Sequence, residues 1–356
     1  MKLAFRVNSS AAIGTGHVMR SLALADALGE RDAVFVARDL SGNVNGRIAA
    51  AGYRLIELEG SGADEARHPW VGVSLEREIA ESIAALRSGG PYRWLFVDNY
   101  GLDARYERAA RALAGGIFAF DDLADRPHDV DALLDQTLVA RGGAAARYRG
   151  LVPPAARLFV GPEFAQLRGQ FVVAKRSLAP RTGEVNAIVI AFGSDTGDAT
   201  EIALAATRTL DVRVTVVLSA SAPGFERVAA AARERTNVTL LPYVDEMADL
   251  LMRHDLAIGA GGTSALERAY LGVPAVVWPI AENQREVIDG LERAGAALAL
   301  PPPVTVETVR ATLAALTANP AAIRAMSRGA LAMMAGRDRN VAEMLAFVRA
   351  PQVVRT

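Results

Sequence analysis

Short apolar runs alternate with longer amphipathic stretches along the first third of the chain. LAFRV at 3–7 and AVFVA at 33–37 are almost continuously apolar, as strands buried inside a parallel sheet are. SLEREIAESIAALRS at 74–88 has the spacing of a helix with one buried face. The predicted strands here are 3–7, 33–37, 53–58, 94–100 and 117–122, and the predicted helices are 21–28, 74–88 and 106–114.

The alternation stops between residues 141 and 185, where glycine, proline and charged residues follow one another without periodicity, and then it resumes. The interruption predicts loops or a connection between two domains. After it, the predicted strands are 187–194, 212–219, 238–244, 256–262 and 274–280, and the predicted helices are 201–210, 225–235, 247–254 and 264–272. The final part of the chain is predicted to be mostly helical.

Strand–helix alternation on both sides of an interruption predicts an α/β protein with two Rossmann-like, doubly wound domains facing each other across a cleft. We expect an N-terminal domain at 1–165, an interdomain connection at 166–185 and a C-terminal domain at 186–356. The last helix is expected to be able to pack back on the N-terminal domain. A length of 356 residues suits two domains of ordinary size.

Composition excludes several classes of function. The formal net charge of −1 gives no basic field for nucleic acid or an anionic membrane. The absence of cysteine rules out disulfides, thiolate metal sites and cysteine nucleophiles. MKLAFRVNSS lacks the apolar stretch of a signal peptide, and no apolar run approaches the ~18 residues of a membrane span. We therefore expect a cytoplasmic protein that is not inserted in a membrane. We also expect a monomer.

Three turns that contain glycine follow predicted strands: IGTGH (13–17), FGSD (192–195) and GAGGTS (259–264). Ligands of doubly wound sheets bind beyond the carboxyl ends of strands, and the N-terminus of the next helix attracts a diphosphate. The alternative is that each turn needs glycine for its geometry alone. Met19 excludes the dinucleotide fingerprint GxGxxG for the first turn. The candidate ligand contacts in these turns are Gly14, Gly16, Gly193, Ser194, Gly261 and Gly262.

His17 follows the first glycine turn, which places it near a helix N-terminus and facing the predicted cleft. The positive end of the helix is expected to lower the pKa of His17 and keep the imidazole neutral. A neutral imidazole is the best general base at physiological pH. The alternative is a histidine that only hydrogen-bonds a phosphate or the backbone.

The segment 259–284 carries most of the polar candidates in the second half. Thr263 and Ser264 can cap the next helix. Glu267 can point to the same end of that helix and accept both hydroxyls of a ribose. The alternative, which spacing alone favours, is that Ser264 and Glu267 form a capping box. Further along, a carboxylate and two amides suited to sugar or phosphate oxygens lie after a strand, where an ordinary helix start is the alternative. They are Glu282, Asn283 and Gln284.

Polar residues also follow strands in the first half. Asp98, Asn99 and Tyr100 are candidates to line the cleft. A second group resembles a metal cluster, but aspartates at strand ends often cap the next turn, so no metal is expected. This group consists of Asp121, Asp122 and Asp125. The other histidines, which we interpret as surface or structural residues, are His68, His128 and His254.

Several motifs together resemble one family. They are GTGHVMRSLALA (14–25), VDNYGLDARYE (97–107), FDDLADRPHDVDALLDQ (120–136), GPEFAQLR (161–168) and IGAGGTSALERAYLGVPAVV with AENQ. The chain is similar, from its first strand to about residue 300, to the UDP-2,4-diacetamido-2,4,6-trideoxy-β-L-altropyranose hydrolases of pseudaminic acid biosynthesis. A more distant resemblance is to the N-acetylglucosaminyltransferase of peptidoglycan precursor synthesis, which has the GT-B fold.

The resemblance implies a GT-B hydrolase that needs no metal or cofactor and converts a UDP-sugar into UDP and free sugar. UDP would bind mainly to the C-terminal domain, and water would attack the anomeric carbon with C–O cleavage and inversion. His17 matches the base that activates water, while Tyr100 and Asn283 match residues that hold the sugar and the diphosphate. Arg20 belongs to the same GxGHxxR motif and is expected to contact substrate. The UDP-binding turn is matched by Gly261, Gly262, Thr263, Ser264 and Glu267.

Two departures from the family pattern concern the sugar more than the reaction. FGSDTG stands where relatives have FGGSDP, and GGTSALE stands where they have GGSTxWE. Two other functions stay open: a glycosyltransferase that uses an acceptor hydroxyl in place of water, and a nucleotide-sugar-binding accessory protein without catalysis. A lipid acceptor would require an apolar or basic patch on the N-terminal domain.

Overall fold

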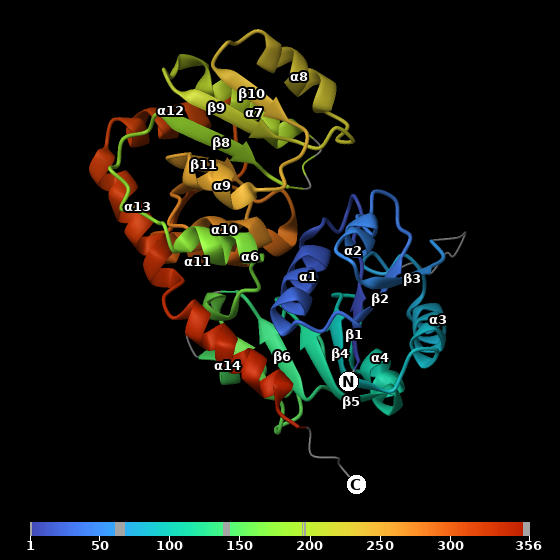
Figure 1. Ribbon diagram of the computed structural model, residues 1–356. Coiled ribbons are helices and arrows are strands. Elements are labelled where there is room, and N and C mark those ends of the chain that lie inside the picture. Colours follow the sequence, from blue (N-terminus) through green and yellow to red (C-terminus); the bar gives the residue numbers. More distant parts are fainter. Residues whose placement is uncertain (1, 61–67, 138–142, 194, 196, 352–356) are drawn as a thin grey trace. The chain divides into compact units, whose positions relative to one another are not determined.

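A computed structural model of the chain describes residues 2–60, 68–137, 143–193, 195 and 197–351 (Figure 1). The chain divides into two compact units. The first combines Met1–Arg168 with Gly336–Thr356, and the second is Gly169–Ala335. The stretch predicted as an interdomain connection contains helix α6 (Gly169–Lys175), which is part of the second unit.

The first unit is built on one parallel sheet with the strand order β3-β2-β1-β4-β5-β6-β7. Its strands are β1 (Leu3–Val7), β2 (Val34–Arg38), β3 (Arg54–Leu58), β4 (Tyr92–Asp98), β5 (Ala114–Phe120), β6 (Ala132–Asp135) and β7 (Arg157–Val160). Its helices are α1 (Gly16–Leu28), α2 (Gly46–Ala50), α3 (Leu75–Arg87), α4 (Ala104–Ala110), α5 (Gly143–Arg147) and α14 (Arg337–Arg349), with short 3-10 turns at Arg111–Leu113 and Pro162–Phe164.

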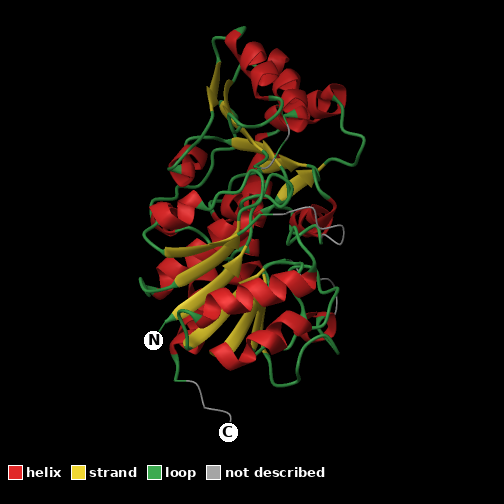
Figure 2. Cartoon of the chain, turned by 90° about the vertical axis from the view of Figure 1, so that its right-hand side faces the viewer, coloured by secondary structure: helices red, strands yellow, loops and turns green. Residues whose placement is uncertain are grey.

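Both faces of this sheet are covered, which is why its central strands are apolar on successive residues. Phe5 and its aromatic neighbours pack against α1, α2 and α14 in one core. Ala4 and the residues that alternate with those phenylalanines pack against α3 and α4 in another core. Figure 2 shows the strands in yellow with helices beside them. Burial on both faces is the arrangement expected of parallel sheets in α/β proteins.

Helix α14 returns to the first unit after the chain has built the second (Figure 1). Val341, Met344 and Val348 on α14 are buried. Met344 and Val348 join the core that contains Phe5. The indole N–H of Trp94 on β4 donates to the carbonyl oxygen of Val348 over 2.9 Å.

The second unit repeats the architecture around a parallel sheet with the strand order β10-β9-β8-β11-β12-β13. Its strands are β8 (Ala187–Ala191), β9 (Arg213–Val217), β10 (Val238–Leu241), β11 (Leu256–Gly259), β12 (Ala275–Val277) and β13 (Ala297–Ala299). Besides α6, its helices are α7 (Asp198–Ala206), α8 (Phe225–Arg233), α9 (Met247–Met252), α10 (Thr263–Tyr270), α11 (Arg285–Arg293), α12 (Val306–Thr317) and α13 (Pro320–Met333), with 3-10 turns η3 (Thr207–Thr209) and η4 (Glu282–Gln284).

Every strand and helix predicted from the apolar pattern is present within a few residues of its predicted bounds, and the α/β class is confirmed. In the described part of the chain, three strands and the helices α2, α5 and α6 were not predicted. β6 and β7 lie where the sequence is acidic or rich in glycine and proline, and β13 is the short stretch ALA inside a region predicted as helical. Strands of three or four residues are too short to produce a readable period.

Within the described part of the chain, none of the helices has the length and hydropathy required to cross a membrane.

Candidate functional site

The strand order of the first unit reverses direction between β1 and β4, so this point is the topological switch point of the sheet. Val7, the last residue of β1, is in register with Asp98, the last residue of β4. The chain runs from β1 through the IGTGH turn into α1. His17 therefore lies in the first turn of α1, beyond the carboxyl end of β1. Ligands of doubly wound sheets bind at such a crevice.

The IGTGH turn gives α1 a start that lacks a side-chain cap. Gly14 has φ +84°, which favours glycine, and its N–H donates to the carbonyl oxygen of Ser10 over 2.8 Å. Thr15 is the N-cap residue, but its side chain makes no cap hydrogen bond, and Gly16 begins the helix. A helix start without a cap offers N–H groups and positive potential to an anion.

His17 forms a hydrogen bond with a buried carboxylate. Its Nδ1 lies 2.5 Å from Oδ1 of Asp98. Because an ionised carboxylate can only accept, Nδ1 carries the hydrogen, and in the neutral ring Nε2 keeps a lone pair. This is the arrangement of a histidine base oriented by an acid.

Asp98 is held by three side chains of α1: His17, Arg20 and Ser21. Arg20 donates through Nε to Oδ2 over 2.8 Å and through Nη2 to Oδ1 over 2.6 Å, and Ser21 donates to Oδ2 over 3.1 Å. The three residues share one helix face because they are spaced i, i+3 and i+4. Burial raises the pKa of Asp98, but the charge of Arg20 and the hydrogen bonds from Arg20 and His17 outweigh burial and lower this pKa to about 2.

We expected Asp98 and Arg20 to contact substrate. In the structure both side chains are buried, and both lie within hydrogen-bond distance of Nδ1 of His17. Asp98 is 1% exposed and Arg20 is 3% exposed. Arg20 also donates to Asp122, as does the hydroxyl of Tyr100. The oxygens of Asp98 are occupied by protein donors, and one of these donors is Nδ1 of His17.

Two aromatic rings flank His17. The Tyr100 ring is 4.6 Å from the imidazole and the Trp70 ring is 5.9 Å away, both in T-shaped contact. The carbonyl oxygen of Trp70 accepts from Nδ2 of Asn99 over 3.0 Å and from Nδ2 of Asn8 over 3.3 Å. Asn99 therefore anchors the loop that carries Trp70. Sequence reasoning missed Trp70 because it lies in a stretch without periodicity or motif.

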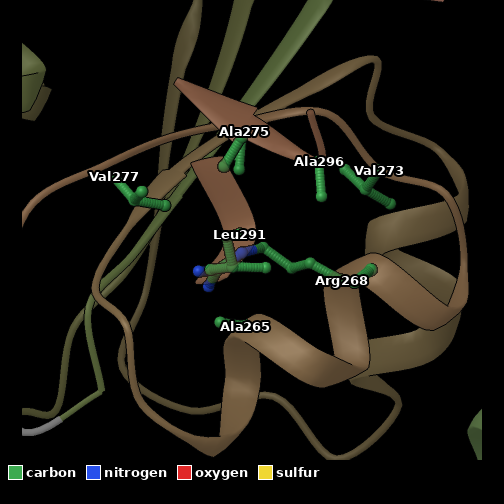
Figure 3. Close-up of a pocket in the computed structure, with 9 residues that line it drawn as sticks. Ala265, Arg268, Val273, Ala275, Val277, Leu291 and Ala296 are labelled. Atoms are coloured by element: carbon green, nitrogen blue, oxygen red, sulfur yellow. The ribbon is translucent and has the colours of Figure 1, made fainter. Parts of the chain in front are cut away.

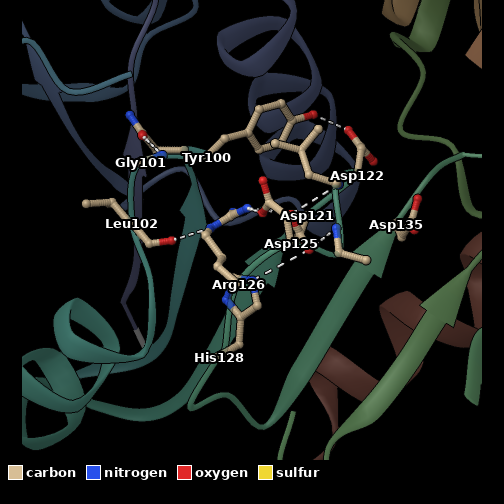
Figure 4. Close-up of polar contacts among 12 residues, drawn as sticks. Tyr100, Gly101, Leu102, Asp121, Asp122, Asp125, Arg126, His128 and Asp135 are labelled. Carbon is tan, nitrogen blue, oxygen red and sulfur yellow. Dashed lines mark hydrogen bonds and ion pairs between the residues drawn. The ribbon is translucent and has the colours of Figure 1, made fainter. Parts of the chain in front are cut away.

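The loop after β5 is held by ion pairs (Figure 4). Asp121 accepts from the N–H groups of Leu123 and Ala124 and pairs with Arg126 over 2.8 Å, while Asp125 also pairs with Arg126. These aspartates therefore cap and brace the turn. Among the described residues, no group of three histidine, cysteine or acidic side chains is arranged to hold a metal ion.

His128 closes the same loop. Its Nδ1 lies 2.7 Å from Oε1 of Glu107, and its Nε2 lies 3.6 Å from Oδ2 of Asp121. Burial lowers the pKa of His128, but the two carboxylates outweigh burial and raise it to about 9. His128 is therefore a buried structural cation at neutral pH.

The two other histidines also make structural contacts. His254 is buried between the carbonyl oxygen of Leu250 and the hydroxyl of Thr215. His68 accepts from the backbone N–H of Trp70 over 3.3 Å.

In the second unit the switch point lies between β8 and β11, and two of the predicted glycine turns follow these strands. Gly193, after β8, has φ +82°. Ser194 lies outside the described residues. The GAGGTS turn follows β11 and leads into α10.

Helix α10 does not begin with the capping box that the spacing of Ser264 and Glu267 favoured. Gly262 is the N-cap residue and makes no side-chain cap bond, while Thr263 and Ser264 are the first two helical residues. Ser264 is therefore not the capping residue, and its hydroxyl accepts from Nη1 of Arg268 over 3.3 Å. Glu267 lies one turn further along α10 and is 7% exposed.

The AENQ segment forms η4 and lies against the same turn. A Cβ added to Gly261 would lie 2.9 Å from the carbonyl oxygen of Gln284, so glycine allows this close approach. Gln284 accepts from the N–H of Ile280 over 3.0 Å, and Glu282 pairs with Arg285 over 2.7 Å. The Asn283 side chain is exposed. The structure thus brings together the turn and the amide segment that the sequence singled out.

Comparison with solved structures decides the fold. The chain is similar to MurG of Acinetobacter baumannii with 15% identity and a TM-score of 0.63, covering 98% of this chain and 99% of MurG. It is also similar to UGT2 of Phytolacca americana with 13% identity and a TM-score of 0.69, covering 98% of this chain and 100% of UGT2. The fold is GT-B. Residues 188–342 match the model of the glycosyltransferase family 28 C-terminal domain.

Curated relatives confirm the resemblance seen in the motifs. A UDP-2,4-diacetamido-2,4,6-trideoxy-beta-L-altropyranose hydrolase of Campylobacter jejuni is 25% identical over 70% of this chain and 81% of its own length. The spore coat polysaccharide biosynthesis protein SpsG of Bacillus subtilis is 28% identical over 43% of this chain and 47% of its own length. The GT-B chain therefore resembles both a UDP-sugar hydrolase and a polysaccharide biosynthesis protein.

Proposed function

We propose that this GT-B protein hydrolyses a UDP-sugar to UDP and the free sugar. The observation that carries the proposal is the pairing of His17 with Asp98, which leaves the Nε2 lone pair of His17 to act as a base. The resemblance to the Campylobacter jejuni hydrolase supports UDP-2,4-diacetamido-2,4,6-trideoxy-β-L-altropyranose as the substrate. The product would then enter pseudaminic acid or related surface-polysaccharide biosynthesis.

In the proposed reaction, Nε2 of His17 removes a proton from water as the water oxygen bonds to the anomeric carbon. The bond between that carbon and the phosphate oxygen breaks, UDP leaves with the electron pair, and the configuration inverts. Asp98 stabilises the imidazolium that forms, as the acid of a histidine dyad does. UDP is a stabilised leaving group, so a second catalytic carboxylate of the glycosidase kind is not required.

The nucleotide is proposed to bind to the second unit. The GAGGTS turn lies within residues 188–342, the range that matches the glycosyltransferase family 28 C-terminal domain. The start of α10 without a side-chain cap suits a diphosphate, and Glu267 is proposed to accept the ribose hydroxyls. The Glu267→Ala variant is expected to bind UDP more weakly.

Glycosyl transfer is a second candidate, and the family 28 domain match favours it. The two reactions share the base and the leaving group and differ only in the nucleophile, which is either water or an acceptor hydroxyl. Turnover that depends on an added acceptor would support transfer.

The test is an incubation of the purified chain with the UDP-sugar in isotopically labelled water, without any acceptor. We expect UDP to be released without the label, because the C–O bond is the one that breaks and the bridging oxygen leaves with UDP. Label in UDP would contradict attack at the anomeric carbon. Binding of the UDP-sugar without release of UDP would favour glycosyl transfer over hydrolysis.

A further inference from the structure

Arg268 is a cation buried behind the GAGGTS turn. It lies on α10, is 3% exposed, and donates through Nη2 to the carbonyl oxygen of Ala260 over 2.6 Å. Its Nη1 donates to the hydroxyl of Ser264, one turn earlier on the helix. Figure 3 shows the side chain extending from α10 into the interior of the unit. The guanidinium thus bonds to the turn that begins α10 and to the first turn of that helix.

No carboxylate within the described part of the chain forms an ion pair with Arg268. Its Nε is buried without a hydrogen-bond partner. A narrow cavity beside it, lined by Ala265, Ala275 and Leu291 among others, has no room for a water molecule. Burial lowers the pKa of Arg268 to about 10, although the nearby charge of Glu267 opposes the shift. Arg268 therefore stays charged at neutral pH in a dry environment.

A buried charge without an ion-pair partner destabilises a protein, and an apolar residue of similar volume is usually better tolerated. The carbonyl oxygen of Ala260 and the hydroxyl of Ser264 satisfy two donors but do not neutralise the charge. Binding of an anion at the start of α10 would neutralise it. The backbone leaves space for the guanidinium, because a Cβ at Gly259 would lie 3.0 Å from Nη1 of Arg268 and 2.5 Å from the carbonyl oxygen of Ala191.

We propose that Arg268 supplies a fixed positive charge behind the GAGGTS turn and thereby makes this turn selective for the diphosphate of a nucleotide over the nucleoside. Arg268 acts through the turn as a positioning residue and does not touch the ligand. The inference rests on the proposed nucleotide site and identifies the group that gives this site its affinity for an anion.

Arg181 provides a matched control. It is a partly buried arginine of the same unit, and it also donates to two carbonyl oxygens, those of Gly272 over 2.8 Å and of His254 over 2.6 Å. The GAGGTS turn joins the end of β11 to the start of α10. Gly272 follows the C-terminal end of α10 and His254 precedes β11, so Arg181 contacts the chain at the other ends of these two elements. Burial lowers the pKa of Arg181 as well.

The test measures dissociation constants of UDP and uridine for the full chain and for the Arg268→Met, Arg268→Lys and Arg181→Met variants. We expect Arg268→Met to weaken UDP binding by about tenfold or more while uridine binding stays within about twofold, since only UDP carries charge. Arg268→Lys keeps the charge and should recover most of the loss. Arg181→Met should leave the ratio of the two constants unchanged.

Equal weakening of UDP and uridine by Arg268→Met, or no change in either, would overturn the inference and leave the nucleotide site standing. A native chain that binds neither ligand would overturn the nucleotide site and the inference together. Thermal unfolding of each variant monitors folding, and Arg268→Met is expected to be at least as stable as the native chain. If Arg268→Met does not fold, the same two dissociation constants are measured for Arg268→Gln. This variant removes the charge but keeps hydrogen-bonding groups.

Discussion

At the scale of single residues, the proposed chemistry depends on one buried carboxylate. Asp98 fixes the hydrogen on Nδ1 of His17, and Arg20 and Ser21 hold Asp98 in place. An Asp98 pKa of about 2 means that this carboxylate stays ionised throughout the neutral range. Substitution of Asp98 should therefore change which ring nitrogen of His17 carries the hydrogen, while the imidazole itself stays in place.

The Asp98→Asn variant tests this role. Its amide N–H₂ can donate to Nδ1, which would place the hydrogen on Nε2 and block proton removal from water. We expect kcat to fall by about 10²–10⁴ while UDP affinity changes less than about twofold, by analogy with the acid of a serine protease triad. Steady-state kinetics and a UDP titration measure the two quantities.

Ser21→Ala is the control for this prediction, because it removes one hydrogen bond to Asp98 but leaves the carboxylate. Its kcat should stay within about tenfold of the native value, since a single hydrogen bond contributes about 1 kcal/mol. An Asp98→Asn variant as active as Ser21→Ala would contradict the orienting role.

At the scale of elements, the loop after β5 is braced by ion pairs. In the loop after β5, His128 lies between Glu107 and Asp121. Asp122 in the same loop contacts Arg20 and Tyr100. The stability of this loop therefore bears on the group of residues around His17.

The raised pKa of His128 predicts a loss of stability at alkaline pH. Its pKa is about 9 in the folded chain and ordinarily about 6.5. Its contribution to the free energy of unfolding is therefore complete below pH ~6.5 and disappears as the pH rises through about 9. Denaturant unfolding of the native chain between these limits should show a decline that the His128→Gln variant lacks.

His254 is the control for the pH prediction, because burial lowers its pKa. A group with a lowered histidine pKa costs stability only as the pH falls below its ordinary value. The His254→Gln variant should therefore keep the alkaline decline of the native chain. An alkaline decline that persists unchanged in His128→Gln would contradict the role given to His128.

The elements also show what the sequence can predict. Long apolar runs such as those of β1 and β8 predicted the strands of both sheets, and three glycine turns were predicted to follow strands. The structure places these turns after β1, β8 and β11, which are the strands at the two switch points. The strand β6 (ALLD) follows an acidic loop and is too short to be recognised by period. The partners of Asp98 were not predictable, because a residue after a strand can face a ligand or a neighbouring helix, and only packing decides which.

At the scale of the whole molecule, the chain returns to its first unit through α14. Met344 of this helix is fully buried in the core that contains Phe5 and Phe159, although it lies near the end of the sequence. The stability of the first unit thus depends on residues that follow the second unit in the chain.

The Met344→Ala variant should destabilise the first unit by about 2–5 kcal/mol through lost burial and the cavity left behind. Denaturant unfolding followed by tryptophan fluorescence measures the effect, since Trp94 contacts α14. Glu343→Ala is the control: Glu343 is 65% exposed in an ion pair with Arg157, and its loss should cost less than about 0.5 kcal/mol. Equal stability of both variants would contradict the placement of α14 in this core.

The central claim is that His17 is the base of a UDP-sugar hydrolase. The most direct test is release of UDP from UDP-2,4-diacetamido-2,4,6-trideoxy-β-L-altropyranose by the purified chain and by His17→Asn, without an acceptor and with UDP affinity measured for both. The account predicts UDP and free sugar from the native chain, and a loss of at least about 100-fold in the variant with UDP binding retained. Turnover near the native rate in His17→Asn would contradict it.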